Sequence, residues 1–95
     1  MVVGVVRLTL HVPENNSLKG KRRVIKQIID KTRNRFSLAI GETGMNDQHR
    51  DAELGIACVG NDRRTCNSVL DRAVDYIESL QTAIITGHEI EIINM

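Results

Sequence analysis

The sequence predicts an α+β fold in which four strands and two helices follow one another in the order βαββαβ. Two periodicities predict it. Four segments alternate apolar and polar residues, as strands with one buried face do, and two segments repeat apolar residues every three or four positions, as amphipathic helices do. With 95 residues and a single proline, the chain has material for one core, so we expect one domain over residues 1–95.

The first half of the chain is expected to form a strand, a helix and a second strand. Residues 2–12, VVGVVRLTLHV, alternate with period two and indicate a strand with one buried face. A turn is expected over residues 13–16. Ser17 then provides an N-cap, because its hydroxyl can accept a hydrogen bond from a free amide of the first helical turn.

The helix that follows Ser17 runs to Arg35 and gathers its apolar residues on one arc. Lys21 lies close to that arc, so we expect its aliphatic stem to pack there while its ammonium group reaches solvent. Residues 36–42 alternate as a second strand. Residues 43–50 have the polar composition of a loop.

The second half repeats the pattern. Residues 52–59 predict a third strand, and Asn61 or Asp62 caps a second helix whose apolar residues continue at helical spacing. Residues 82–93 predict the last strand, with a bulge at Gly87 as one option. Its isoleucines at alternate positions are expected to face the core and its glutamates to face away: Ile84, Ile90 and Ile92 inward, Glu89 and Glu91 outward.

Right-handed crossovers would arrange these elements as a ferredoxin-like sandwich, a four-stranded antiparallel sheet of order 4-1-3-2 with both helices on one face. Each strand offers one apolar face, which is enough for a single layer of helices. The other face of the sheet is therefore expected to be open. It would carry small, polar and charged residues: Arg7, Thr9, His11, Ser37, Ala39, Gly41, Glu53, Gly55, Ala57, Glu89 and Glu91.

Composition places the chain among globular proteins, with 41% hydrophobic and 26% charged residues. The longest apolar run, Val2 to Val6, is too short for a membrane span or a signal-peptide core. Cys58 and Cys66 stand eight positions apart, which fits neither a redox C-x-x-C motif nor a zinc ligand pair, so reduced thiols facing the core are expected. These features indicate a cytoplasmic protein with no membrane partner, cofactor or metal.

Four stretches carry a resemblance that runs nearly end to end: SLKGKRR at 17–23, NRF at 34–36, GIACVGND at 55–62 and EIEII at 89–93. They resemble the YlxP-like family of small bacterial proteins of unknown function. The resemblance implies a ferredoxin-like fold and a bacterial cytoplasmic protein whose relatives are often encoded beside translation and ribosome-maturation factors, and it implies no established activity. The chain departs from the family pattern in one place, because DQHRD at 47–51 lacks the Trp expected near the end of that loop.

The predicted first helix is strongly basic. Residues 17–35 hold eight of the thirteen basic residues and one of the twelve acidic residues, so this segment carries +7 and the remainder of the chain −6. On a helical wheel five cations gather opposite the apolar arc as a basic stripe: Lys19, Arg22, Arg23, Lys26 and Arg33.

Such a basic stripe suits phosphate groups, so structured RNA or a ribosomal particle is the expected partner. Two other interpretations remain open. The stripe can be a solvated helix face, in which Asp30 pairs with Lys26 and Arg33 one turn away. It can also dock on an acidic protein surface, because the rest of the chain is acidic and a second copy would offer such a surface.

The open sheet face supports a second hypothesis. With one Phe, one Tyr and no Trp, the chain lacks an aromatic platform there, so base stacking is disfavoured and RNA contacts should depend on backbone charge and shape. Its small residues make this face flat, which favours a homo-oligomer or a protein-docking module. The candidate interface residues are Arg7, Ala39, Gly41, Glu53, Gly55, Ala57, Glu89 and Glu91.

Catalytic patterns are weak, so a non-enzymatic protein is expected. His11 and His88 lie where adjacent strand ends could bring them together, but two histidines without a placed carboxylate make a poor metal site. His49 has Asp47 and Asp51 nearby in the sequence and no nucleophile. The segment GKRR lacks the G-x-x-x-x-G-K-[ST] spacing of a phosphate-binding loop, and no small-molecule substrate is evident.

Overall fold

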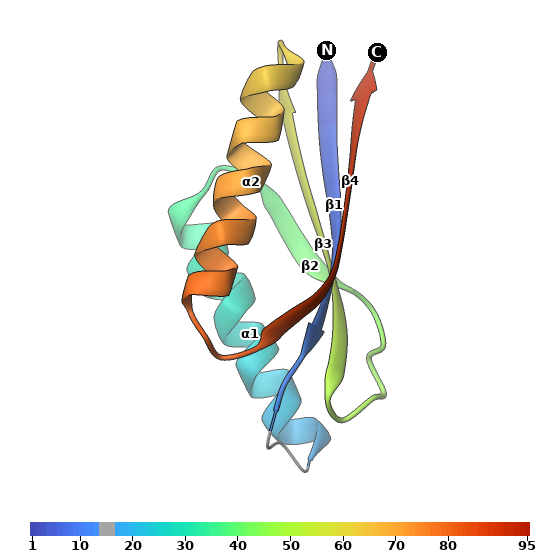
Figure 1. Cartoon of the computed structure of the whole chain (residues 1–95), viewed down its shortest axis with the longest axis vertical. Helices are drawn as coiled ribbons and strands as arrows, with labels where there is room; N and C mark the ends of the chain where they lie inside the picture. The colour runs from blue at the N-terminus through green and yellow to red at the C-terminus, as the bar shows by residue number, and fades with distance from the viewer. Residues whose placement is uncertain (14–16) are drawn as a thin grey trace.

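The architecture is a four-stranded sheet with two helices on one of its faces (Figure 1). The structure is a computed structural model that describes residues 1–13 and 17–95, so most of the turn predicted over residues 13–16 lies outside the described residues. The elements follow the predicted order: β1 (Val2–His11), α1 (Leu18–Arg35), β2 (Ala39–Gly44), β3 (Asp51–Gly60), α2 (Arg63–Ser79) and β4 (Ile84–Asn94).

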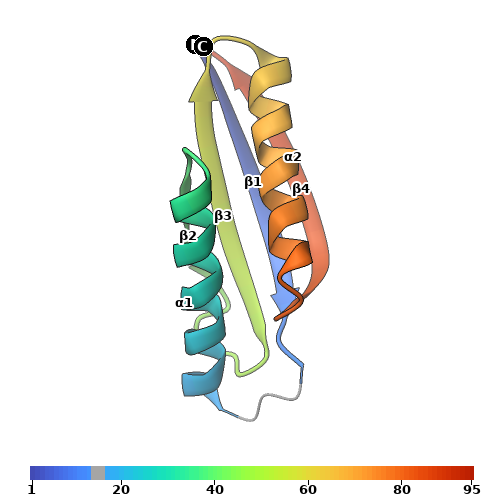
Figure 2. The same ribbon diagram turned by 90° about the vertical axis from the view of Figure 1, so that its left-hand side faces the viewer.

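The strands lie side by side in the order β2-β3-β1-β4, and each neighbouring pair is antiparallel. This confirms the predicted ferredoxin-like arrangement. β1 and β3 are paired over their whole length, from Val2 opposite Gly60 to His11 opposite Asp51. Figure 2 shows the two helices next to each other across the sheet, with α1 on the β2 side and α2 nearer to β1 and β4.

The core fills the space between the sheet and the helices, because the buried parity of each strand faces α1 and α2. Gly4 continues the buried parity of β1 without a side chain, and a Cβ there would lie 2.7 Å from Leu70 Cδ1. Gly4 thus lets α2 approach the sheet closely. The two central strands and the helices supply most of the fully buried apolar side chains: Leu8, Leu10, Leu54, Ile56, Ile25, Ile28 and Leu70.

Both helices begin at side-chain caps. Ser17 Oγ accepts a 3.0 Å hydrogen bond from the Gly20 amide, as the predicted N-cap requires. Asp62, rather than Asn61, caps α2, because its carboxylate accepts hydrogen bonds from the Thr65 amide at 2.7 Å and the Thr65 hydroxyl at 3.0 Å. These bonds favour the ionised form and hold the pKa of the Asp62 carboxyl below its usual value of 3.8.

The second strand starts later than predicted. The Phe36 amide donates a 3.0 Å hydrogen bond to the Thr32 carbonyl, so Phe36 still belongs to the end of α1, and β2 begins at Ala39. Ser37, predicted on the open face of the sheet, precedes the strand.

The inward position predicted for Ile84 was wrong. A bulge interrupts the pairing of β4 with β1 between the partners of Thr9 and Leu10, next to Gly87, and it shifts the alternation by one residue. Ile85 therefore packs against the core, whereas Ile84 is 54% exposed and lies opposite His11 on the open face.

Candidate nucleic-acid interface

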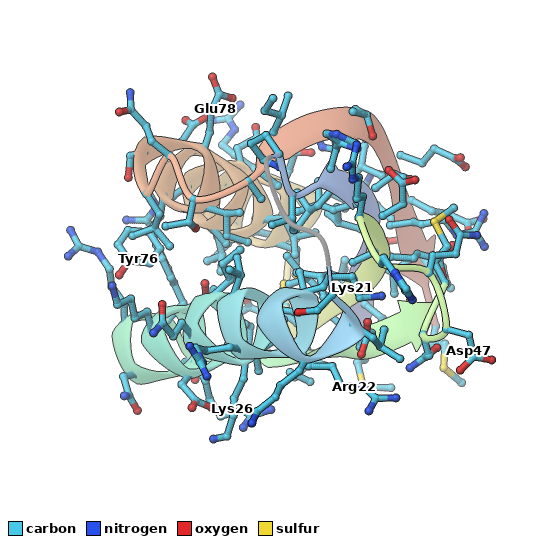
Figure 3. All side chains as sticks on the ribbon, turned by 90° about the horizontal axis from the view of Figure 1, so that it is seen from below. Lys21, Arg22, Lys26, Asp47, Tyr76 and Glu78 are labelled. Carbon is cyan, nitrogen blue, oxygen red and sulfur yellow. The ribbon has the colours of Figure 1, made fainter. Side chains whose placement is uncertain are left out.

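The predicted basic stripe lies along one flank of α1. The Arg33 guanidinium donates a 2.8 Å hydrogen bond to the Ile40 carbonyl of β2, so this flank overlooks the β2 edge of the sheet. Figure 3 shows Arg22 and Lys26 pointing to one side of α1, away from Tyr76 of α2. Every member of the stripe is exposed: Lys19, Arg22, Arg23, Lys26 and Arg33.

The five cations of the basic stripe differ in whether they form an ion pair or a hydrogen bond with other groups of the protein. Lys26 forms a 3.0 Å ion pair with Asp30 one turn away, while Arg33 donates to a carbonyl of β2 instead. Within the described part of the chain, Lys19, Arg22 and Arg23 take part in no ion pair. These three are therefore the most available to an external anion.

Lys21 is a different kind of cation, and the prediction that its ammonium group reaches solvent was wrong. Its side chain is 0% exposed. Nζ donates hydrogen bonds to the carbonyl oxygens of Met45 at 2.8 Å and Asp51 at 3.0 Å, and it lies 3.6 Å from Glu42 Oε2. Figure 3 shows this side chain on the sheet side of α1. Lys21 thus ties α1 to both ends of the β2–β3 loop and adds nothing to the surface charge.

The opposite flank of α1 faces α2 through a cluster that the sequence analysis missed. The Arg35 guanidinium carbon lies 4.9 Å from the ring centre of Tyr76, within cation–π range. Phe36 meets the same ring edge-on, with centroids 5.8 Å apart. The two aromatic residues of the chain come from different helices, so no local sequence pattern could reveal their contact. Together with Arg72, this cluster lines a depression between the helices.

The open face carries all the predicted interface residues, because strand pairing places them on one side of the sheet. Near its middle, Arg7 lies 3.6 Å from Glu53 and 3.7 Å from Glu89. The end nearer the chain termini is apolar and includes Val3, Val5, Val59 and Ile93.

The two strand histidines do not approach each other. His11 lies opposite Ile84 on the open face, where its Nδ1 is 3.0 Å from Asp51 Oδ1. His88 lies opposite Leu8, whose buried side chain faces the helices. The two imidazoles therefore stand on opposite faces of the sheet and cannot share a ligand.

The two cysteines lie in the core, as predicted, and both are free thiols. Burial raises the pKa of the Cys58 thiol above its usual value of 9.0, and the neighbouring Cys66 raises it further. Cys58 is therefore protonated at neutral pH and is a poor nucleophile.

Comparison with protein families gives a match across most of the chain. Residues 3–90 match the family described as "Protein of unknown function (DUF503)". The chain belongs to this family. A relative, the uncharacterized protein YlxP of Bacillus subtilis (strain 168), is 31% identical over 78 residues, which cover 82% of this chain and 85% of the relative. These matches confirm the family resemblance predicted from the sequence.

Solved structures share the fold at low sequence identity. The structural-genomics protein YJCS has a TM-score of 0.62 at 7% identity, over 97% of this chain and 99% of that protein. LarC2, the C-terminal domain of a cyclometallase involved in the synthesis of the NPN cofactor of lactate racemase, has a TM-score of 0.53 at 10% identity, over 98% of this chain and 55% of that one. At these identities the likeness concerns the fold alone.

Over residues 1–13 and 17–95, neither α1 nor α2 has a long enough apolar stretch to span a bilayer.

Proposed function

We propose that this protein binds structured RNA or a ribonucleoprotein particle through the basic stripe of α1, and that it does so without a catalytic centre. Three exposed cations carry the proposal, because Lys19, Arg22 and Arg23 form no ion pair within the described chain. Phosphate oxygens suit such cations, and neutralising a phosphate releases condensed counterions.

The binding mode should rely on the RNA backbone rather than on the bases. Phe36 and Tyr76 contact each other between the helices, so neither stands on the open sheet face as a stacking platform. The stripe itself lies on a helix whose first turns are held by the buried Lys21. A row of cations on a fixed helix recognises phosphate groups and duplex shape, with little discrimination between sequences.

Binding of a fluorescent hairpin RNA, measured by anisotropy at several salt concentrations, tests the proposal. The double variant Arg22→Glu/Arg23→Glu is expected to weaken binding and to reduce the slope of log K against log salt concentration by about two. The matched control is Arg64→Glu/Arg72→Glu, which makes the same change of charge at exposed positions of α2. This control should keep the wild-type slope.

Two results would contradict the proposal. If both double variants lose affinity equally, the net charge of the protein governs binding and the α1 flank has no special role. If the Arg22→Glu/Arg23→Glu variant binds as the wild type does, α1 is not the binding surface. A hairpin with a scrambled stem sequence should bind with the same affinity as the original, because phosphates carry no sequence information.

A further inference from the structure

We infer that two copies of this chain associate through their open sheet faces, related by a two-fold axis that runs parallel to the strands. The open face of one copy is thus covered by the open face of the other. This surface lies on the opposite side of the sheet from α1, so the inference does not depend on RNA binding.

The open face has a hollow half and a ridged half. The hollow lies over β2 and β3, where a shallow groove is lined by Ala39, Gly41 and Ala57, and the Thr43 side chain covers Gly55 at one end of it. The ridge lies over β1 and β4, where the side chains are longer. Strand pairing sets residues of the four strands side by side across the sheet. In one such row Ala39 and Ala57 of the hollow half lie beside Val5 and Glu91 of the ridged half. In the next row Gly41 and Gly55 lie beside Arg7 and Glu89.

Only one of the two simple face-to-face arrangements places ridge in hollow. An axis parallel to the strands lays β1 and β4 of one copy over β3 and β2 of the other, so each ridge enters the hollow of the second copy. An axis perpendicular to the strands would lay each strand over its own counterpart. Ridge would then meet ridge, and Glu89 and Glu91 would face the same two carboxylates of the second copy.

The charges favour the same axis. Arg7 would lie beside the Thr43 side chain that covers Gly55 of the second copy, two residues along β3 from the Glu53 carboxylate of that copy. Glu89 and Glu91 stand on the outer strand β4, so they would reach over β2 of the second copy.

The open face is large enough for a weak dimer. Three strands of 10, 10 and 11 residues and the six-residue β2, about 4.8 Å apart, present roughly 600 Å² per copy, which is at the low end for specific interfaces. The apolar end adds hydrophobic contacts, since Val59 is 71% and Ile93 is 41% exposed in the single chain. We therefore expect a dissociation constant in the micromolar range.

Sedimentation equilibrium from about 1 to 500 µM protein tests the inference. The wild-type mass is expected to rise from the 10.6 kDa of one chain to twice that value. Gly41→Leu fills the hollow, and the single chain accommodates it, because a Cβ at Gly41 meets no atom within 4 Å and its φ is not positive. It should raise the dissociation constant about 10-fold.

Ala57→Arg places an uncompensated charge in the middle of the interface and should raise the dissociation constant by at least about 100-fold. The matched control is Gln27→Arg at an exposed position of α1, which should dimerise as the wild type does. Circular dichroism of each variant verifies that it is folded. A monomer at every concentration, or a dimer that Gly41→Leu and Ala57→Arg both leave intact, would overturn the inference.

Mixing the wild type with Glu91→Lys tests the direction of the axis. With the axis parallel to the strands, Glu91 and its counterpart lie on opposite sides of the interface, so the mixed dimer should be intermediate in strength between the two parent dimers. With the perpendicular axis, Glu91 would face the new lysine, and the mixed dimer would be stronger than either parent. The second result would overturn the proposed arrangement.

Discussion

Lys21 and Arg22 are neighbours in the first turns of α1 and carry the same charge, yet they occupy opposite environments. Lys21 is fully buried and bound by the β2–β3 loop, while Arg22 is exposed and forms no ion pair in the described chain. A rotation of about 100° around the helix axis separates the two. The charge of α1 is thus divided between a cation that holds the fold together and cations that are available to a partner.

The buried lysine is tolerated because its surroundings replace water. An ammonium group has three donors, and two of them reach the carbonyl oxygens of Met45 and Asp51. The Glu42 carboxylate, 3.6 Å away, balances the charge. Glu42 Oε2 is itself buried and accepts no hydrogen bond within the described residues, so the nearby ammonium is its compensation.

The largest effect should come from removing the buried member of this comparison. Lys21→Ala leaves Glu42 and two loop carbonyls without their cation, and it should lower the free energy of unfolding by about 3–5 kcal/mol. Arg22→Ala removes an exposed cation and should change it by no more than about 0.5 kcal/mol. Urea denaturation of both variants checks the difference. Equal costs would mean that the burial of Lys21 has no energetic role.

A smaller change in the free energy of unfolding should show whether Glu42 or the backbone carbonyls stabilise the buried Lys21. Lys21→Met and Glu42→Gln, alone and combined, form a double-mutant cycle, and we expect a coupling free energy of about 1–2 kcal/mol between the two side chains. Urea unfolding of the four proteins gives this value. A coupling near zero would assign the stabilisation to the backbone carbonyls of Met45 and Asp51 rather than to the carboxylate.

The smallest change in stability should come from the exposed carboxylate of Asp62, which stabilises α2 only through the hydrogen bonds that it accepts. Asp62 caps α2, and its pKa in the folded chain lies below the value of 3.8 that it has when unfolded. Its charge therefore adds stability above pH 3.8, and this contribution is lost as the pH falls through the folded pKa.

Thermal unfolding of the wild type and of Asp62→Asn between about pH 7 and pH 2.5 checks this prediction. Asparagine keeps a cap without the charge, so the wild type should be the more stable protein at neutral pH, and its advantage should shrink in acid. An advantage that stays constant down to the lowest pH would show that the charge of Asp62 does not contribute.

Most of the fold could be predicted because the apolar residues of most helices and strands repeat with the period of that element. The alternation of β1 and β3 and the apolar arcs of both helices are local patterns, and they led to the observed strand order. Ile84 was misplaced because a bulge depends on how two strands pair, which alternation within one strand does not reveal. The late start of β2 depends in the same way on a backbone bond, from Phe36 to Thr32.

The candidate site was predictable to a similar extent. The basic stripe follows from helical spacing alone, and so does the pair formed by Lys26 and Asp30. The burial of Lys21 does not, because its partners come from β2, β3 and the loop between them. Its position beside the apolar arc was the only sequence signal, and a lysine there normally extends its ammonium group into water.

The bulge in β4 has a counterpart in β2, the strand at the opposite edge of the sheet. In β2, Glu42 lies opposite Leu54 and Gly44 lies opposite Glu53, so Thr43 is left over as an extra residue. Both outer strands are therefore interrupted, while the central pair is regular. An interrupted outer strand is a poor template for the addition of another strand. Each bulge therefore makes its own stretch of the outer edge unfavourable for sideways growth of the sheet into fibres.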